Sequence, residues 1–269
     1  MEDHTLEAHL AFRPTQKDFS PVEWAMRVKL AACYRLIDLY GMTDMIYNHA
    51  SARVPGPEEH FLINPFGLRY AEITASTLLK VDVGGKEIFN PWKDYGINKA
   101  GYVIHSAIHE ARPDIECVIH THTPYGMAVS TLECGLLPLT QTSLRFSKVA
   151  YHDYEGVVVD FDEQERLLKN LGDAEAMILR NHGLLTIGAT VEQAFNNIYR
   201  LERSCKTQVL AMSTGGSLIE LPDGVVQRTN KQLSLQPSAG TPGNQKPYGV
   251  LEWHAMLRWL DSIDPSYRT

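Results

Sequence analysis

The sequence contains few cysteines, and their spacing predicts no cross-link. Only four stand among 269 residues, and none is paired with another at short spacing. We interpret Cys33, Cys117, Cys134 and Cys205 as reduced, small apolar side chains. This pattern excludes a disulfide-rich secreted domain and a zinc knuckle as explanations of the fold.

Long hydrophobic runs and an excess of positive charge are also lacking. No apolar run reaches the ~18 residues of a membrane-spanning helix, and the N-terminus shows no basic region followed by an apolar one. The formal net charge is -7 and the pI is about 5.9, so the overall field does not attract nucleic acid or acidic membranes. We therefore expect a cytoplasmic protein with no nucleic-acid partner and no membrane partner.

What remains is the composition of one large folded domain. With 44% hydrophobic and 21% charged residues, 269 residues are enough for one core and few for two. Helical and strand-like segments interleave with hairpins, which predicts an α/β fold: a three-layer α/β/α sandwich around a central mixed, mostly antiparallel sheet. We expect an N-terminal arm over 1–20, the main domain over 21–216, and a linker with a C-terminal helix over 217–269.

Local signals place the elements. Ser20-Pro21-Val22-Glu23 is a capping box, with Glu23 reaching back, for a helix that stops at Gly41. A Gly-Gly turn predicts a hairpin over 80–89. The other expected helices cover 101–111, 124–132, 163–170 and 190–213, and the other expected strands include 48–54, 61–63 and 157–159. Segment 222–247, rich in Gln, Ser, Gly, Thr and Pro, predicts a linker or extended arm. The helix over 250–263 either docks on the core or crosses onto a neighbouring subunit.

Two histidines end a short run of β-branched residues, Cys117 to Thr123. Side chains alternate along a strand, so His120 and His122 point to the same side. Two imidazoles on one side are the beginning of a divalent-metal site, which needs a third ligand. His182, at a tight turn between two apolar strands, is the candidate. Alone, His182 is better explained as a hydrogen-bonded turn residue, and the pair of His120 and His122 is equally well explained as a polar patch. Only the combination favours a metal.

The segments Ile119-His120-Thr121-His122 and Arg180-Asn181-His182-Gly183 resemble the class II aldolase and adducin head-domain family. The resemblance runs from about Pro21 to Gly216, and the segment over 149–154 is closer to adducin heads than to sugar-phosphate aldolases. It implies a small-molecule substrate and a homotetramer. It also implies one divalent metal ion per chain, zinc first, with Fe(II), Mn or Co as alternatives.

The resemblance also assigns catalytic roles. In family aldolases a Glu moves the proton and a Tyr from the adjacent subunit assists the aldehyde. Tyr151 falls at the tyrosine position, although an aromatic filling the core or an interface is an equal alternative. Gly101 falls at the glutamate position and cannot transfer a proton. Some other group must then serve as the base.

The helix before the histidine strand offers a replacement for that base. His105 and His109 are four residues apart and share one helix face. His105 is the candidate proton carrier or supporting residue, and the alternative is that it holds a backbone carbonyl. We expect His109 and Glu110 to be solvated. His152 and Asp153 either orient Tyr151 or cap a turn.

The substrate-binding positions are partly changed. The family's Thr-Pro-Ser/Thr-Gly turn is here Asn64-Pro65-Phe66-Gly67, so a ring replaces a hydroxyl that would bond phosphate. Asn48, Ser51 and Gly67 remain as substrate-binding candidates, and Lys99 can pair with an anion. Asn and Ser near turns also act as structural caps.

Three functions are consistent with these residues. The first is a metal-dependent lyase, aldolase-like enzyme or epimerase acting on a small hydroxy-carbonyl compound without the usual glutamate. The second is a non-haem Fe(II) oxygenase of an aromatic 2-oxo or 2-hydroxy acid, because three histidines leave open positions on iron. The third is a non-catalytic, adducin-like interaction module.

Overall fold

The computed structural model describes residues 5–146, 148–156, 161–235 and 246–269, and its centre is one eight-stranded sheet. The strand order is β4-β3-β2-β1-β5-β8-β7-β6. Every neighbouring pair is antiparallel except β6 and β7, which confirms the mixed, mostly antiparallel sheet. The strands are β1 (His49–Arg53), β2 (His60–Ile63), β3 (Leu79–Asp82), β4 (Glu87–Phe89), β5 (Cys117–Thr121), β6 (Ala150–His152), β7 (Ala176–Leu179) and β8 (Gly183–Gly188).

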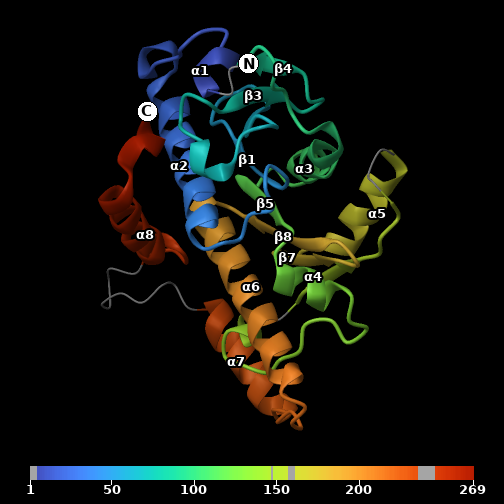
Figure 1. Ribbon diagram of the computed structural model, residues 1–269. Helices are drawn as coiled ribbons and strands as arrows, with labels where there is room; N and C mark the ends of the chain where they lie inside the picture. The colour runs from blue at the N-terminus through green and yellow to red at the C-terminus, as the bar shows by residue number, and fades with distance from the viewer. Residues whose placement is uncertain (1–4, 147, 157–160, 236–245) are drawn as a thin grey trace.

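Helices cover both faces of the sheet, which confirms the three-layer arrangement (Figure 1). One face carries α2 (Pro21–Leu39), α6 (Val191–Ser213) and α8 (Val250–Ile263), and the other carries α3 (Lys99–Ala111) and α5 (Phe161–Leu171). The short helix α4 (Pro124–Ser130) follows β5 and lies against α6. Strand alternation divides the core accordingly: Ile119 packs on the α2 and α6 side, whereas Val118 packs against α3.

The capping signals begin helices where expected. Ser20 Oγ accepts a hydrogen bond from the Glu23 N–H at 3.2 Å, and Pro21 is the first residue of α2. The second half of the predicted capping box is wrong, because the Glu23 carboxylate instead pairs with Arg27 and Lys80. Asn98 and Thr190 cap α3 and α6 in the same way as Ser20.

The chain ends lie against the same body. The N-terminal segment forms α1 (Leu6–His9) and a 3-10 turn η1 (Gln16–Asp18), and it bonds the backbone beyond β4 through Ala11 N–H to Pro91 O at 2.8 Å. Further 3-10 turns cover Tyr70–Glu72 (η2), Ser143–Arg145 (η3) and Pro265–Arg268 (η4). Trp253 and Leu260 of α8 are buried against α2 and α6, so this helix docks on its own chain.

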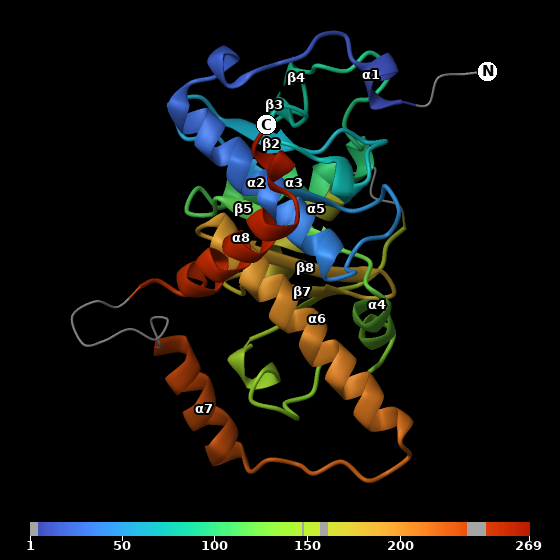
Figure 2. The same ribbon diagram turned by 60° about the vertical axis from the view of Figure 1, so that its left-hand side comes forward.

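The expected extended arm over 222–247 is wrong for Asp223–Leu235, which form helix α7. Val, Gln, Arg, Lys and Leu in this stretch tolerate a helix, and the end of α7 is held where Arg145 Nη1 donates to the Leu233 carbonyl at 3.2 Å. Together α7 and the end of α6 extend away from the sheet (Figure 2). The predicted strand over 157–159 lies outside the described residues. Within the described ranges, no helix is long and apolar enough to cross a membrane.

Candidate metal centre and its pocket

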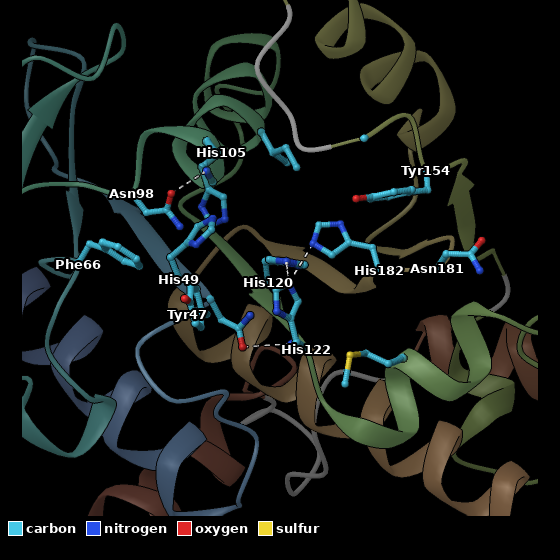
Figure 3. A pocket seen from close by; sticks show the side chains of 16 residues that line it. Tyr47, His49, Phe66, Asn98, His105, His120, His122, Tyr154, Asn181 and His182 are labelled. Carbon is cyan, nitrogen blue, oxygen red and sulfur yellow. Dashed lines mark hydrogen bonds between the residues drawn. The ribbon is translucent and has the colours of Figure 1, made fainter.

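Three histidines converge at the C-terminal end of β5. His120 is in β5 and His122 follows its last residue, while His182 lies in the turn between β7 and β8. Because β8 pairs with β5, this turn lies beside the end of β5. The Nε2 atom of His122 is 2.9 Å from Nε2 of both His120 and His182 (Figure 3). The expected meeting of these side chains is present in the structure, and their role as ligands stays a prediction.

The hydrogen bonds of Nδ1 in His120 and His122 determine whether Nε2 of each ring carries a proton or a lone pair. His120 Nδ1 lies 2.9 Å from the Leu184 carbonyl oxygen, and His122 Nδ1 lies 3.2 Å from Asp44 Oδ2. Both neighbours accept hydrogen bonds, so each neutral ring carries its proton on Nδ1 and turns an Nε2 lone pair inward. Converging lone pairs repel one another unless a cation lies among them. This donor set therefore fits a divalent ion such as zinc or iron.

Burial keeps the cluster in the form that binds metal. It lowers the pKa of His120 well below the ordinary value, and the neighbouring His182 and His122 add to this effect. Burial, followed by the field of His122, lowers the pKa of His182 to about 4. These two rings are therefore neutral at pH 7, as metal ligation requires.

A fourth histidine, His49, fills the space beside Gly101. His49 pairs with His120 across β1 and β5, so both side chains lie on the α3 side of the sheet with ring centroids 5.7 Å apart. A Cβ atom at Gly101 would lie 2.0 Å from His49 Cε1. Position 101 therefore accepts no side chain while His49 is in place. His49 is buried, and its Nδ1 has no hydrogen-bond partner in the described part of the protein.

Sequence reasoning missed His49, although a signal was present. His49 and Ser51 alternate along β1 and therefore share a face. What the sequence lacked was the pairing of β1 with β5, which brings His49 opposite His120. Burial lowers the pKa of His49 to about 4, so the ring is neutral at pH 7.

A buried polar chain supports this wall of the pocket. Ser51 Oγ lies 2.7 Å from His105 Nδ1 and 2.8 Å from His109 Nε2. The rings of His105 and His49 are 4.4 Å apart, and His105 lines the pocket. The alternative that His105 holds a carbonyl is wrong, because its partner is a hydroxyl. The expectation of a solvated His109 is also wrong: α3 presses it onto Phe61, with ring centroids 4.4 Å apart, whereas Glu110 is exposed as expected.

The four substrate-binding candidates take different places. Asn48 lines the pocket, and its Oδ1 accepts a hydrogen bond from the His122 N–H at 3.1 Å. Ser51 lies behind His105, outside the lining. Gly67 packs against Tyr95, where an added Cβ would lie 2.7 Å from the ring. Lys99 is exposed at the start of α3 and does not line the pocket.

Tyr151 lies in β6, away from the pocket of its own chain. Its hydroxyl accepts a hydrogen bond from the Leu136 N–H at 3.0 Å, and the Arg180 guanidinium lies 4.3 Å from its ring centroid. A catalytic role toward a neighbouring copy stays a prediction. His152 does not orient Tyr151, because its ring nitrogens contact Glu163 and Asn170 of α5. Asp153 is exposed.

The histidines open onto a cavity of about 560 Å³ (Figure 3). Its size is that of a small-molecule site. Its described lining comprises Tyr47, Asn48, His49, Phe66, Asn98, Ala100, Gly101, Ile104, His105, His120, His122, Met127, Tyr154, Gly156, Asn181 and His182. Fold and cavity together define an α/β protein with a candidate divalent-metal centre in a substrate-sized pocket.

Comparison with known proteins identifies the family. The family model for the class II aldolase and adducin N-terminal domain matches residues 28–209. The chain belongs to this family. A crystal structure of an aldolase II superfamily protein from Pseudomonas syringae superposes with a TM-score of 0.87 at 50% identity, covering 95% of this chain and 99% of that one.

Two further relatives represent the enzymatic and the adducin branches. An L-fuculose 1-phosphate aldolase from Glaciozyma antarctica superposes with a TM-score of 0.77 at 30% identity, covering 96% of this chain and 97% of that one. Alpha-adducin of Rattus norvegicus is 44% identical over 92% of this chain, which corresponds to 34% of the adducin. The family resemblance found in the histidine motifs is confirmed.

Proposed function

We propose that this protein is a metal-dependent enzyme that performs a lyase, aldolase-like or epimerase-like reaction on a small hydroxy-carbonyl compound. The observation that carries the proposal is the convergence of three imidazole nitrogens at a 560 Å³ cavity. His120, His122 and His182 would hold one divalent ion per chain, zinc first. Such an ion, when bound, polarises a carbonyl and stabilises negative charge on its oxygen. The name of the Glaciozyma antarctica relative supports a lyase.

The base in this proposal is His49, at the place where the family's glutamate would project from position 101. His49 lines the cavity, and a neutral imidazole there can accept a proton from a substrate carbon or hydroxyl. His105 acts as a positioning residue, because its ring packs on His49 and is held from behind by Ser51. Asn48 orients the ligand cluster through the His122 backbone.

A homotetramer, which the family resemblance implies, is part of the same proposal, and Tyr151 would act there on the pocket of another copy. Its hydroxyl is outside the lining of its own cavity. Sedimentation or light scattering measures the assembly directly. A monomer at micromolar concentration with full activity would remove Tyr151 from the mechanism.

Elemental analysis of protein purified without added metal, in air and anaerobically, tests the metal centre. We expect about one zinc per chain in the unmodified protein. His120→Ala should lose it, whereas His254→Ala, which changes an exposed histidine of α8, should retain it. One iron per chain would instead favour the Fe(II) oxygenase. No metal in either preparation would refute the proposal.

A non-catalytic, adducin-like module is the second candidate, and the 44% identity to alpha-adducin favours it. The two candidates differ in their dependence on the histidines. An interaction module should keep its partner affinity when the metal is stripped or His120 is replaced. An enzyme should lose turnover in both cases.

A further inference from the structure

Aromatic and apolar side chains flank the histidine cluster. In Figure 3, Tyr47 and Phe66 lie on one side of the cluster and Tyr154 on the other. The rings of Tyr47 and Phe66 are 5.9 Å apart. Tyr47, Met127 and Tyr154 are 46%, 39% and 54% exposed, although all three line the cavity. Exposed apolar side chains gathered around one cavity mark a surface that binds an apolar group.

The same pocket offers little to a phosphate. No Lys or Arg occurs among its described lining residues, and Lys99 is exposed outside that lining. Phosphate sites on turns use free backbone N–H groups. Here the Phe66 N–H donates to the Gly96 carbonyl at 2.7 Å, and the Leu68 N–H donates to the Pro65 carbonyl at 3.4 Å. The ring of Tyr95 packs against the Cα of Gly67 between them.

The first turn of α3 contributes positive potential at the cavity. One of its N–H groups, that of Gly101, already has an acceptor in Asn98 Oδ1 at 3.5 Å. A helix N-terminus favours an anion by a modest amount, and it suits a carboxylate as well as a phosphate. Lys99, the cation on this turn, is exposed outside the described lining of the cavity, so the turn by itself does not select a doubly charged phosphate.

We infer that the cavity accepts an α-hydroxy or α-oxo carbonyl compound whose substituent is an aryl or similar apolar group rather than a phosphate. The inference rests on the proposed function for the end of the ligand that meets the histidines. The other end is selected by Tyr47, Phe66 and Tyr154. A cavity of 560 Å³ has room for a ring beside a two-carbon hydroxy-acid group.

Three probes test the two ends of the ligand independently: lactate, phenyllactate and 3-phosphoglycerate, whose phosphate is on the carbon farthest from the carboxylate. They share an α-hydroxy acid and differ in having hydrogen, phenyl or phosphate at one carbon. Calorimetric titration of zinc-loaded protein should show phenyllactate binding at least about tenfold tighter than lactate, because a buried ring contributes its transfer free energy. Phosphoglycerate should bind no tighter than lactate.

Variants test whether the rings of Phe66 and Tyr47 provide this gain in affinity for phenyllactate. Phe66→Ala and Tyr47→Ala should each remove most of the phenyl gain and leave lactate binding unchanged. Phe12→Ala, which removes an exposed ring of the N-terminal segment, should leave both affinities unchanged. Because both Phe66→Ala and Tyr47→Ala are used, misfolding of one does not remove the test.

The outcomes distinguish this inference from the function on which it rests. Equal affinity for lactate and phenyllactate, or tighter binding of phosphoglycerate, would overturn the aromatic selectivity while leaving the metal centre intact. Zinc-loaded protein that binds none of the probes would also overturn it. Failure to load zinc at all would refute the proposed function instead, and elemental analysis of the same sample detects it.

Discussion

Replacing Gly101 by Ala is the sharpest test of the wall that surrounds His49. The added Cβ would lie 2.0 Å from His49 Cε1 and 2.5 Å from its Nε2. The ring has little room to withdraw, because it is 4% exposed and packs 4.4 Å from His105. Overpacking of a buried site costs about 1–3 kcal/mol. Removing a helical glycine returns up to about 1 kcal/mol. We expect a net loss of roughly 1–2 kcal/mol.

Urea unfolding of five proteins measures this loss: the unmodified protein, Gly101→Ala, His49→Ala, the double variant of these two, and Gly224→Ala as the control. Gly224 lies in the first turn of α7 with nothing within 4 Å of an added Cβ, so the control should be neutral or slightly stabilised. In the double variant the space is free, and the two changes should couple favourably by about 1–2 kcal/mol. A Gly101→Ala protein as stable as the control would refute the steric argument.

Three further predictions use other parts of the molecule. Glu202 accepts a hydrogen bond from the Gly126 N–H in the first turn of α4, and burial raises the pKa of its carboxyl from 4.5 to about 7. The protonated carboxyl therefore stabilises the fold. This contribution is fully present below pH 4.5 and is lost as pH rises through 7. Glu202→Gln should therefore stabilise at pH 8 by up to about 3 kcal/mol and not at pH 4; equal gains at both would contradict this. Arg27→Ala should cost about 3–5 kcal/mol in chemical unfolding, because it removes one of the two cations paired with the buried Glu23 and the buried donor to the Ala75 and Leu78 carbonyls; a loss below about 1 kcal/mol would count against this network. Zinc should stay bound on stepwise acid dialysis down to at least about pH 4, the pKa of metal-free His182, because protons compete for this ligand only below that pH; release centred at about 6.5, the ordinary pKa of histidine, would contradict this.

Several features of this protein were predictable because they depend on near neighbours in the chain. Alternation along β5 places His120 and His122 on one side whatever the rest of the fold does. The caps at Ser20 and Thr190 act within one helical turn, and they begin α2 and α6 where expected. The histidine motifs also indicated the family, and the interleaving of helical and strand-like segments indicated the three-layer fold. The His182 turn lies beside the end of β5, where the third histidine was expected.

Other features depended on which elements pack together. The wrong expectation for α7 has a local origin, since a polar composition without strong helix signals does not exclude a helix that docks on η3. His109 was expected in solvent because the sequence does not show what its face of α3 packs against. In the structure that face packs onto the sheet, where His109 lies against Phe61. Lys99 was a candidate for pairing with an anion because it lies near Gly101 in sequence. As the first residue of α3 it is instead exposed, outside the lining of the pocket.

The sequence by itself determined the three-histidine set, the caps and the absence of a residue able to move a proton at Gly101. Only the tertiary structure decided what takes that place. Pairing of β1 with β5 and the packing of α3 across them bring His49 into the volume that a side chain at Gly101 would need. The same packing joins His105, Ser51 and His109 behind it. Such contacts join residues more than 50 positions apart in the chain, and periodicity over a few neighbours carries no information about them.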